Sequence, residues 1–332
     1  MNPLFESLHL GSDQEPGIRR RGSKRFTYVD ERSRRAPSGR DLERIRALAV
    51  PPAWSDVWIA ADAGSHLQAT GRDARGRKQY RYHPAFTESQ SENKFDDLVA
   101  FAQVLGSLRS RVTRDLARDD LSHDRVVATV VRLLDLTSLR VGNIEYARAN
   151  RSFGLTTLRS RHVTVRGTTI RLTFRGKSAH DFDVFVDNAR LAKIVRACQH
   201  LPGQQLFEYA EVDGMVRAIG SSDVNTYLGE HGAPGMTAKT FRTWHATVRA
   251  AEGLADVAAI EEAPTKRVLN AVVDQVADHL GNTRSICLKS YVHPAVVDTY
   301  LDGSLVKHWR RPIGRRPSGL MDSERRTLRL LR

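Results

Sequence analysis

The sequence is poor in cysteine and has no long apolar run. Cys198 and Cys287 are the only cysteines, and their spacing fits neither a disulfide framework nor a zinc-binding pattern. Free thiols of this kind favour a reducing compartment. No apolar run approaches the roughly 18 residues of a membrane span, and residues 1–22 lack the apolar centre of a signal peptide. We therefore expect a cytoplasmic protein without a membrane partner.

Acidic residues are scarce relative to basic ones. The 332 residues include 52 lysines and arginines against 38 aspartates and glutamates, which gives a net charge of +14. With 40% hydrophobic residues the chain can bury a core and form two domains. A folded chain of this charge favours a polyanionic partner, because each phosphate contact releases counterions. The charge alone also fits an arginine-rich genome or a ribosome-associated protein.

Sequence patterns divide the chain into a β-rich part and a helical part. A helix is expected over 42–49, and four segments have the composition of strands: 25–29, 57–60, 66–70 and 77–83. The polar run 87–93 is the best linker candidate. We predict an α+β fold, with a β-rich N-terminal domain over 1–90, in which 1–24 are loose. A mostly α-helical domain follows over 91–332 and contains one small sheet.

Positive charge is concentrated in the last 26 residues. Residues 307–332 hold nine lysines and arginines against two acids, so +7 of the +14 lies there. The apolar spacing of this segment, through Leu320, Leu328, Leu330 and Leu331, is thin. The pattern fits either a short helix or a flexible strap across a polyanion.

One tyrosine and three cations have the composition of a site that cleaves phosphodiesters. Transfer of a phosphoryl group to a protein hydroxyl needs a nucleophile, guanidinium donors on the non-bridging oxygens and an acid for the leaving oxygen. Tyr291, the pair Arg140 and Arg242, and Lys177 supply this set, and no carboxylate cluster accompanies them to hold a metal. Each residue alone also has an ordinary explanation, such as a helix-dipole partner, a solvated turn cation or a half-buried aromatic.

Six motifs follow one another in the order of a known family: 51–54 (PPAW), 71–84 (GRDARGRKQYRYHP), 140–143 (RVGN), 174–177 (FRGK), 239–244 (KTFRTW) and 290–291 (SY). On these motifs the chain resembles a bacterial, poxvirus-like type IB DNA topoisomerase from about residue 25 to 302. The resemblance implies an isomerase that relaxes supercoiled duplex DNA through a reversible 3′-phosphotyrosyl link. It also implies that the reaction requires no ATP, metal or other cofactor and that the protein has no small-molecule substrate.

The resemblance also implies a role for each site residue. Arg140 and Arg242 hold the non-bridging oxygens, Lys177 is the general acid, and Tyr291 is the nucleophile. A lysine among arginines is expected to have a lowered pKa, and a tyrosine of pKa about 10 needs cations nearby. Most relatives have a histidine nine residues before the tyrosine, where this chain has Asn282. An asparagine can donate to an oxygen but cannot act as an acid or base, and it also fits a helix-ending turn.

DNA contacts are implied in both domains. Alternation along a strand puts Tyr80 and Tyr82 on one face, with Arg81 opposite, which suits a strand lying on DNA and equally an edge strand protected by charge. The resemblance places Gln79 and both tyrosines in the major groove. The predicted DNA-binding residues are Arg75, Arg77, Lys78, Gln79, Tyr80, Tyr82, Tyr146 and Lys239.

We predict a nucleoid-associated monomer that clamps duplex DNA, preferably supercoiled, between the β-rich domain and the α-helical catalytic domain. Residues 84–95 are the expected hinge. Two alternatives remain open. A tyrosine recombinase shares the catalytic fold and residue order, but characteristically has histidine where this chain has Lys239. A non-catalytic basic DNA-binding protein would not need Tyr291.

Overall fold

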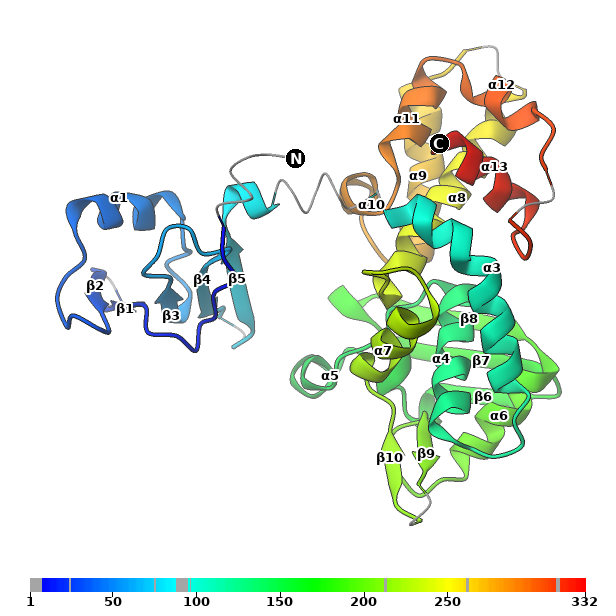
Figure 1. Cartoon of the computed structure of the whole chain (residues 1–332), viewed down its shortest axis with the longest axis horizontal. Helices are drawn as coiled ribbons and strands as arrows, with labels where there is room; N and C mark the ends of the chain where they lie inside the picture. Colours follow the sequence, from blue (N-terminus) through cyan, green and yellow to red (C-terminus); the bar gives the residue numbers. More distant parts are fainter. Residues whose placement is uncertain are drawn as a thin grey trace. The chain divides into compact units, whose positions relative to one another are not determined.

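The computed structural model describes residues 8–23, 25–74, 76–87, 95, 97–211, 214–260, 263–314 and 317–332. The chain forms two compact units, Met1–Phe95 and Asp96–Arg332. Figure 1 shows strands and a few short helices in the first unit and mainly helices in the second. The predicted α+β class is confirmed. Within the described residues, no helix combines the length and apolar composition needed to cross a membrane.

The first unit is built on an antiparallel sheet with the strand order β2-β1-β3-β4-β5. Its elements are β1 Ile18–Arg21, β2 Thr27–Asp30, α1 Gly39–Ala47, β3 Ser55–Ile59, β4 Leu67–Arg72 and β5 Lys78–Tyr82. Ile45 of α1 packs into a core of apolar side chains from β1, β3 and β4. The hairpin predicted over 66–83 is therefore confirmed as β4 and β5.

One prediction for this unit is wrong. The loose segment predicted over 1–24 contains a strand, because residues 18–21 form β1 between β2 and β3. Ile18 is opposite Ile59 in the sheet and is only 2% exposed. Of the predicted hinge 84–95, residues 88–94 lie outside the described residues.

The second unit is mostly helical. Its helices are α3 Asp97–Leu116, α4 His123–Thr137, α5 Ile144–Asn150, α6 Ala189–Gln199, α7 Ser221–His231, α8 Ala238–Ala258, α9 Lys266–Leu280, α10 Arg284–Ser290, α11 Pro294–Leu301, α12 Leu305–Arg310 and α13 Asp322–Leu330. The apolar positions predicted on α4, namely Val126, Val127, Val130, Val131 and Leu134, are all buried. Helix α8 lies against α3, α4, α9 and α13. It is the central helix of this unit (Figure 1).

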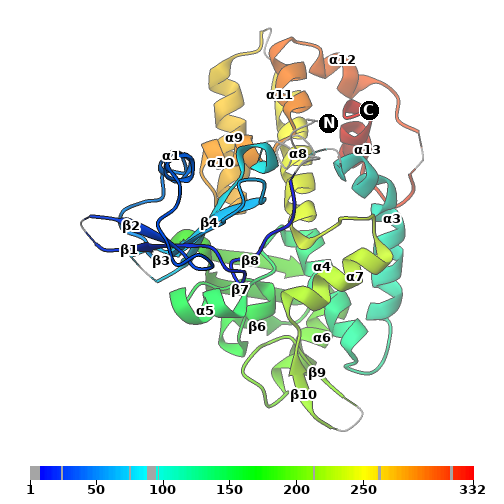
Figure 2. The same ribbon diagram turned by 60° about the vertical axis from the view of Figure 1, so that its left-hand side comes forward.

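A small antiparallel sheet, β6 Val163–Arg166, β7 Thr169–Arg175 and β8 Asp181–Asp187, completes the core beside the helices. Along β7, Ile170, Leu172 and Phe174 are buried, whereas the residues between them are exposed. Helix α6 lies against β6 and β7 (Figure 2). The predicted sheet is confirmed, and its β7–β8 turn carries Lys177. A short hairpin, β9 Glu208–Ala210 with β10 Val216–Ala218, forms a second sheet elsewhere in the unit, so the prediction of only one small sheet is wrong.

The basic C-terminal segment contains ordered helices. Helix α13 packs on α3, α8 and α12 and buries Leu328 and Glu324, of which Glu324 is 0% exposed. Arg326 and Arg329 donate to backbone carbonyls around the end of α12, including Arg329 Nη1 to the Pro312 oxygen at 2.8 Å. Residues 322–330 therefore follow the short-helix alternative, and the flexible strap is wrong for them.

Candidate active site

Two arginines meet at the end of α9. Arg140 follows α4, and its Nη1 donates to the Leu280 carbonyl at 3.5 Å. Arg242 on α8 donates from Nη2 to the same carbonyl at 2.8 Å. The last carbonyls of a helix lack partners within the helix, so they are natural acceptors for cations. The Leu280 oxygen thus brings together two guanidinium groups that lie about a hundred residues apart in sequence.

Arg242 is a buried cation. The residue is only 3% exposed, and its Nη1 donates to the Ser138 carbonyl at the end of α4. Burial and the neighbouring Arg140 charge lower the pKa of Arg242 to about 10. The guanidinium is therefore still charged at neutral pH. Its Nε is buried and has no hydrogen-bond partner in the described parts of the chain.

Tyr291 follows α10 and lies against Arg242. The Arg242 Cζ is 5.3 Å from the centroid of the tyrosine ring, within the range of a cation–π contact. Burial raises the pKa of the Tyr291 hydroxyl, but the charge of Arg242 and a hydrogen bond with it, together with two further cations, outweigh burial. Arg140 and Lys239 act in the same direction as Arg242, so the pKa lies below its ordinary value of 10. The phenol is thus easier to ionise than a free tyrosine.

The backbone at Tyr291 is held by α8. Thr247 Oγ1 donates to the Tyr291 carbonyl at 3.1 Å and accepts from the His293 backbone N–H at 3.2 Å. The same helix therefore positions both Arg242 and the tyrosine.

Asn282 lies in the helix-ending turn that is one of the two interpretations of this position. Gly281 ends α9 with φ 61°, and the Asn282 backbone N–H donates to the Ala277 carbonyl at 2.9 Å, as at a typical glycine-ended helix. Its side chain then faces Arg140, because Oδ1 accepts from Arg140 Nη2 at 2.7 Å. The remaining donor, Nδ2, is buried without a partner among the residues that the structure describes.

Lys177 lies at the exposed turn between β7 and β8. The turn is tight, since Ser178 and Ala179 both have positive φ, 61° and 62°. The Lys177 side chain makes no hydrogen bond or ion pair with any described residue. The structure therefore shows a free cation on a constrained turn.

The β7–β8 hairpin touches the α9 end beside Asn282. A Cβ added at Gly281 would lie 2.7 Å from the Phe182 ring and 2.8 Å from the His180 ring. Glycine at 281 therefore permits both the positive φ and the close approach of the hairpin. This contact brings the Lys177 turn to the part of the unit that holds Arg140 and Arg242.

The remaining predicted DNA-binding residues are distributed over both units. Lys239 is exposed on the first turn of α8, and Tyr146 is half-buried on α5. Tyr80 and Tyr82 are exposed on one face of β5 with their rings stacked, 6.1 Å between centroids. Three neighbouring side chains bond to aspartates. Arg77 and Gln79 both bond to Asp73, and Lys78 forms an ion pair with Asp13 at 2.6 Å. Arg75 lies outside the described residues.

Sequence reasoning missed the groups that hold the arginines and the backbone at Tyr291 in place. Ser138, Thr247 and Leu280 act through backbone carbonyls or a single hydroxyl. Backbone acceptors leave no residue-type signal, so only the helix ends at 138 and 280 could have suggested them. No group of three or more potential metal ligands occurs among the described residues.

Comparison with known proteins matches most of the chain. A family described as "Eukaryotic DNA topoisomerase I, catalytic core" matches residues 83–309, and "Bacterial DNA topoisomerase IB, N-terminal domain" matches residues 25–73. The chain belongs to the type IB DNA topoisomerases. It is thus an isomerase that relaxes DNA, as predicted, and the match favours neither a recombinase nor a non-catalytic DNA-binding protein.

Similar proteins occur in viruses and fungi. The chain is 28% identical to DNA topoisomerase 1B of Acanthamoeba polyphaga mimivirus, over 89% of this chain and 90% of the relative. It is 20% identical to DNA topoisomerase 1B of Vaccinia virus (strain Copenhagen), over 78% of this chain and 82% of the relative. DNA topoisomerase 1 of Mycosarcoma maydis is 27% identical over 60% of this chain but only 22% of that protein.

Proposed function

We propose that this topoisomerase relaxes duplex DNA by transesterification at Tyr291. The phenolate oxygen attacks a backbone phosphorus, the bond to the DNA 5′-oxygen breaks, and that oxygen leaves as a 5′-hydroxyl. Attack by the same hydroxyl reverses the step and releases the tyrosine. One phosphodiester bond replaces another, so the exchange needs no ATP. The observation that carries this proposal is the contact between Tyr291 and the buried, charged Arg242.

Arg140, Arg242 and Asn282 would hold the non-bridging oxygens of the scissile phosphate. Each guanidinium carries five N–H donors, so both arginines keep donors after bonding to the Leu280 carbonyl. The buried Nδ2 of Asn282 and Nε of Arg242 are further donors without partners in the described chain. Fixed donors of this kind stabilise the charge that develops on phosphorus oxygens.

Lys177 would be the general acid that protonates the leaving 5′-oxygen. Its turn belongs to the hairpin that touches the end of α9 through Phe182 and His180, and the side chain has no ion pair with a described residue. A free ammonium group on a fixed turn suits proton donation.

The enzyme would act as a monomer that clamps duplex DNA, preferably supercoiled, between its two units. Tyr80 and Tyr82 offer an exposed aromatic face on β5, and Tyr146 and Lys239 lie on helices of the catalytic unit. Arg75, Arg77, Lys78 and Gln79 would complete the DNA contacts of the first unit. We place this activity in the cytoplasm, on the nucleoid.

Plasmid relaxation in EDTA without ATP tests the proposal. Positively and negatively supercoiled plasmid should both relax, and trapped complexes should carry the protein on the 3′ end. Tyr291→Phe should abolish relaxation and trapping, whereas Tyr209→Phe, in the β9–β10 hairpin, should retain both. An absolute requirement for Mg²⁺, protein on the 5′ end, or an active Tyr291→Phe enzyme would overturn the mechanism.

A further inference from the structure

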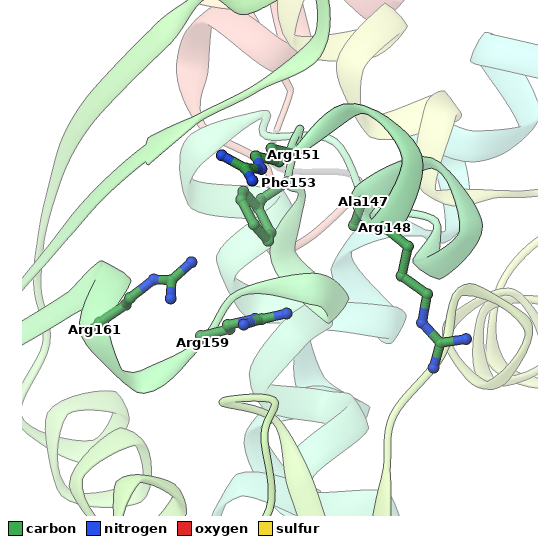
Figure 3. A pocket seen from close by; sticks show the side chains of 6 residues that line it. All are labelled: Ala147, Arg148, Arg151, Phe153, Arg159 and Arg161. Atoms are coloured by element: carbon green, nitrogen blue, oxygen red, sulfur yellow. The ribbon is translucent and has the colours of Figure 1, made fainter. Parts of the chain in front are cut away.

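A pocket of about 520 Å³ lies in the catalytic unit between α5 and the short turn Ser160–His162. It is lined by Ala147, Arg148, Arg151, Phe153, Arg159 and Arg161. Figure 3 shows arginines from both sides of the pocket around the Phe153 ring. None of these residues has a role in the cleavage mechanism proposed above.

The four arginines of this pocket have no acidic counter-charge. No carboxylate lines the pocket, and none of the four guanidinium groups forms an ion pair within the described chain. Other exposed arginines of the same unit do find carboxylates, as in the pairs Arg171–Asp183 and Arg284–Asp274. A concave surface with several guanidinium groups that lack ion pairs attracts anions. One guanidinium can donate two parallel hydrogen bonds to two oxygens of a phosphate.

Phe153 forms the aromatic wall of the pocket, and its ring packs against His162. The rings of Phe153 and His162 are 4.4 Å apart between centroids. His162 is fixed, because its Nδ1 accepts from the Arg159 backbone N–H at 3.1 Å. Burial lowers the pKa of His162, and the charges of Arg161 and Arg159 lower it further, so the ring is neutral at neutral pH. The wall is therefore uncharged while the rim is cationic.

We propose that this pocket binds a nucleotide, with its phosphate on the arginines and its base against Phe153. The volume lies within the roughly 300–1,000 Å³ of small-molecule sites. Bases of any sequence stack on aromatic side chains, and cations beside them hold the backbone phosphate. A free nucleotide and an unpaired nucleotide of a DNA strand share this chemistry. Binding at this pocket is independent of the cleavage mechanism.

The segment that carries Phe153 is bonded through its backbone to the residue Arg140 and to the strand that precedes Lys177. The Phe153 backbone N–H donates to the Arg175 carbonyl at 2.8 Å, two residues before Lys177. The Leu155 N–H donates to the Arg140 carbonyl at 2.9 Å. A nucleotide stacked on Phe153 would therefore rest on the segment that links Arg140 to the Lys177 turn.

Binding measurements on the full chain test this proposal. All variants are made in the Tyr291→Phe background, and intact DNA on a denaturing gel checks that no cleavage accompanies binding, so the binding result is read separately from the proposed mechanism. The probes are fluorescent ADP, inorganic phosphate, a short single-stranded oligonucleotide and a duplex of the same sequence, all at one salt concentration. The double variant Arg159→Ala/Arg161→Ala is compared with Arg190→Ala/Lys193→Ala on α6, which removes the same charge from exposed positions outside the pocket. Thermal melting checks that each variant is folded.

The pocket variant should weaken binding of ADP, of the single strand, or of both by about tenfold or more, and the α6 control by less than about twofold. Phe153→Leu should weaken the same probe about fivefold or more, because it removes stacking. ADP binding would identify a free nucleotide as the source, and binding of the single strand alone would identify DNA. The proposal is overturned if the two double variants lose affinity equally, if no probe but the duplex binds, or if Phe153→Leu has no effect.

Discussion

At the residue scale, a single side-chain atom of Asn282 is expected to affect the rate of DNA cleavage. Its Oδ1 is occupied by Arg140, and its buried Nδ2 is a donor without a described partner. If Nδ2 bonds to a non-bridging oxygen as charge develops, Asn282→Ala should slow single-turnover cleavage by roughly 10²- to 10³-fold. DNA affinity should change little, because the bond is strongest in the transition state.

Two further variants of this position separate the donor from the acceptor. Asn282→Asp keeps an acceptor for Arg140 but has no N–H, so it should be at least as slow as the alanine variant. Asn282→His should keep substantial activity and gain a pH dependence near about 6.5, the ordinary histidine pKa. Full activity of Asn282→Ala would leave the residue as a helix-ending turn only.

The proposed role of Lys177 can be tested through the leaving group. A general acid speeds cleavage only while the leaving oxygen is a strong base. Sulfur in place of the 5′-bridging oxygen is a much better leaving atom and needs no proton. It should restore cleavage by Lys177→Ala but not by Arg140→Ala, as measured by single-turnover cleavage of the two substrates. Equal rescue of both variants would show that the roles are assigned wrongly.

Sequence motifs can predict which side chains form this site, but not what holds them. Residue type and order predict Tyr291 and Arg242, and the structure brings the two into contact. The Leu280 carbonyl, which accepts from two arginines, could not be predicted because any residue type supplies a carbonyl. The pKa of Arg242 is equally hidden in the sequence, since it depends on burial produced by the packing of α8.

Helix α13 matters at the scale of elements, because it supplies a buried carboxylate to the catalytic unit. Arg109 on α3 donates to Glu324 at 2.8 Å and also to Asp135 on α4 at 2.8 Å. Trp244 Nε1 donates to Glu324 as well, at 3.3 Å. The Glu324 carboxylate thus bonds directly to α3 and α8, and Arg109 links it to Asp135 on α4.

Glu324→Ala should destabilise the catalytic unit by about 3 kcal/mol, because it removes one of the two carboxylates that compensate the Arg109 charge and leaves the buried Trp244 Nε1 without its acceptor. Urea unfolding measures the loss. Asp322→Asn is the matched control, since Asp322 is exposed in its pair with Arg325 and should cost less than about 1 kcal/mol. An equal effect of both substitutions would show that the network does not stabilise the unit.

Helix α9 carries a histidine that should make stability depend on pH. Burial lowers the pKa of His279 to about 4, and the charges of Arg249, His245 and Arg242 act in the same direction. The unfolded chain binds the proton at an ordinary pKa of about 6.5. Burial of the neutral ring therefore does not reduce the free energy of unfolding above about pH 6.5. As the pH falls from there to about 4, the unfolding free energy decreases by on the order of 2–3 kcal/mol.

His279→Gln should flatten this part of the pH profile. The measurement is the difference in unfolding free energy between the parent and the variant at several pH values, which cancels the titration of other groups. A difference that stays constant from pH 7 to pH 4 would contradict the lowered pKa.

Elements with a regular apolar period can be predicted, and elements held by single interactions cannot. The period of α4 is matched by burial at each of its predicted apolar positions. Strand β1 reads Ile-Arg-Arg-Arg, so its single apolar side chain gives no alternation, and it is a strand because Ile18 fits the core beside Ile59. The position of α13 depends on the polar Glu324, which no hydrophobic pattern indicates.

At the scale of the whole molecule, some cations of the C-terminal segment bond to backbone carbonyls and others are exposed to solvent. Arg326 and Arg329 are occupied by carbonyls near α12, whereas Lys307, Arg310 and Arg311 are exposed. Deletion of 307–332 would also remove Glu324, so point variants test DNA binding by these cations more cleanly. Substituting Lys307, Arg310 and Arg311 by alanine should make the log–log slope of DNA affinity against salt concentration shallower by about 0.9 for each phosphate that the variant no longer neutralises.

Binding measured over a range of salt concentrations gives this slope. The variant Arg190→Ala/Lys193→Ala on α6 controls for the removal of charge elsewhere. A slope that equals that of the parent would mean that these three cations do not bind DNA phosphates.

The ion pair between Arg109 and Glu324 also determines when the catalytic unit can finish folding during biosynthesis. The two residues are 215 positions apart, which corresponds to roughly 10–40 s of translation at about 5–20 residues per second. Throughout that interval α3, α4 and the Trp244 side chain exist without the carboxylate that joins them. The first unit closes its own sheet long before, since all its strands precede residue 83. A nascent chain therefore carries a finished β-rich unit while its catalytic unit still lacks residue 324.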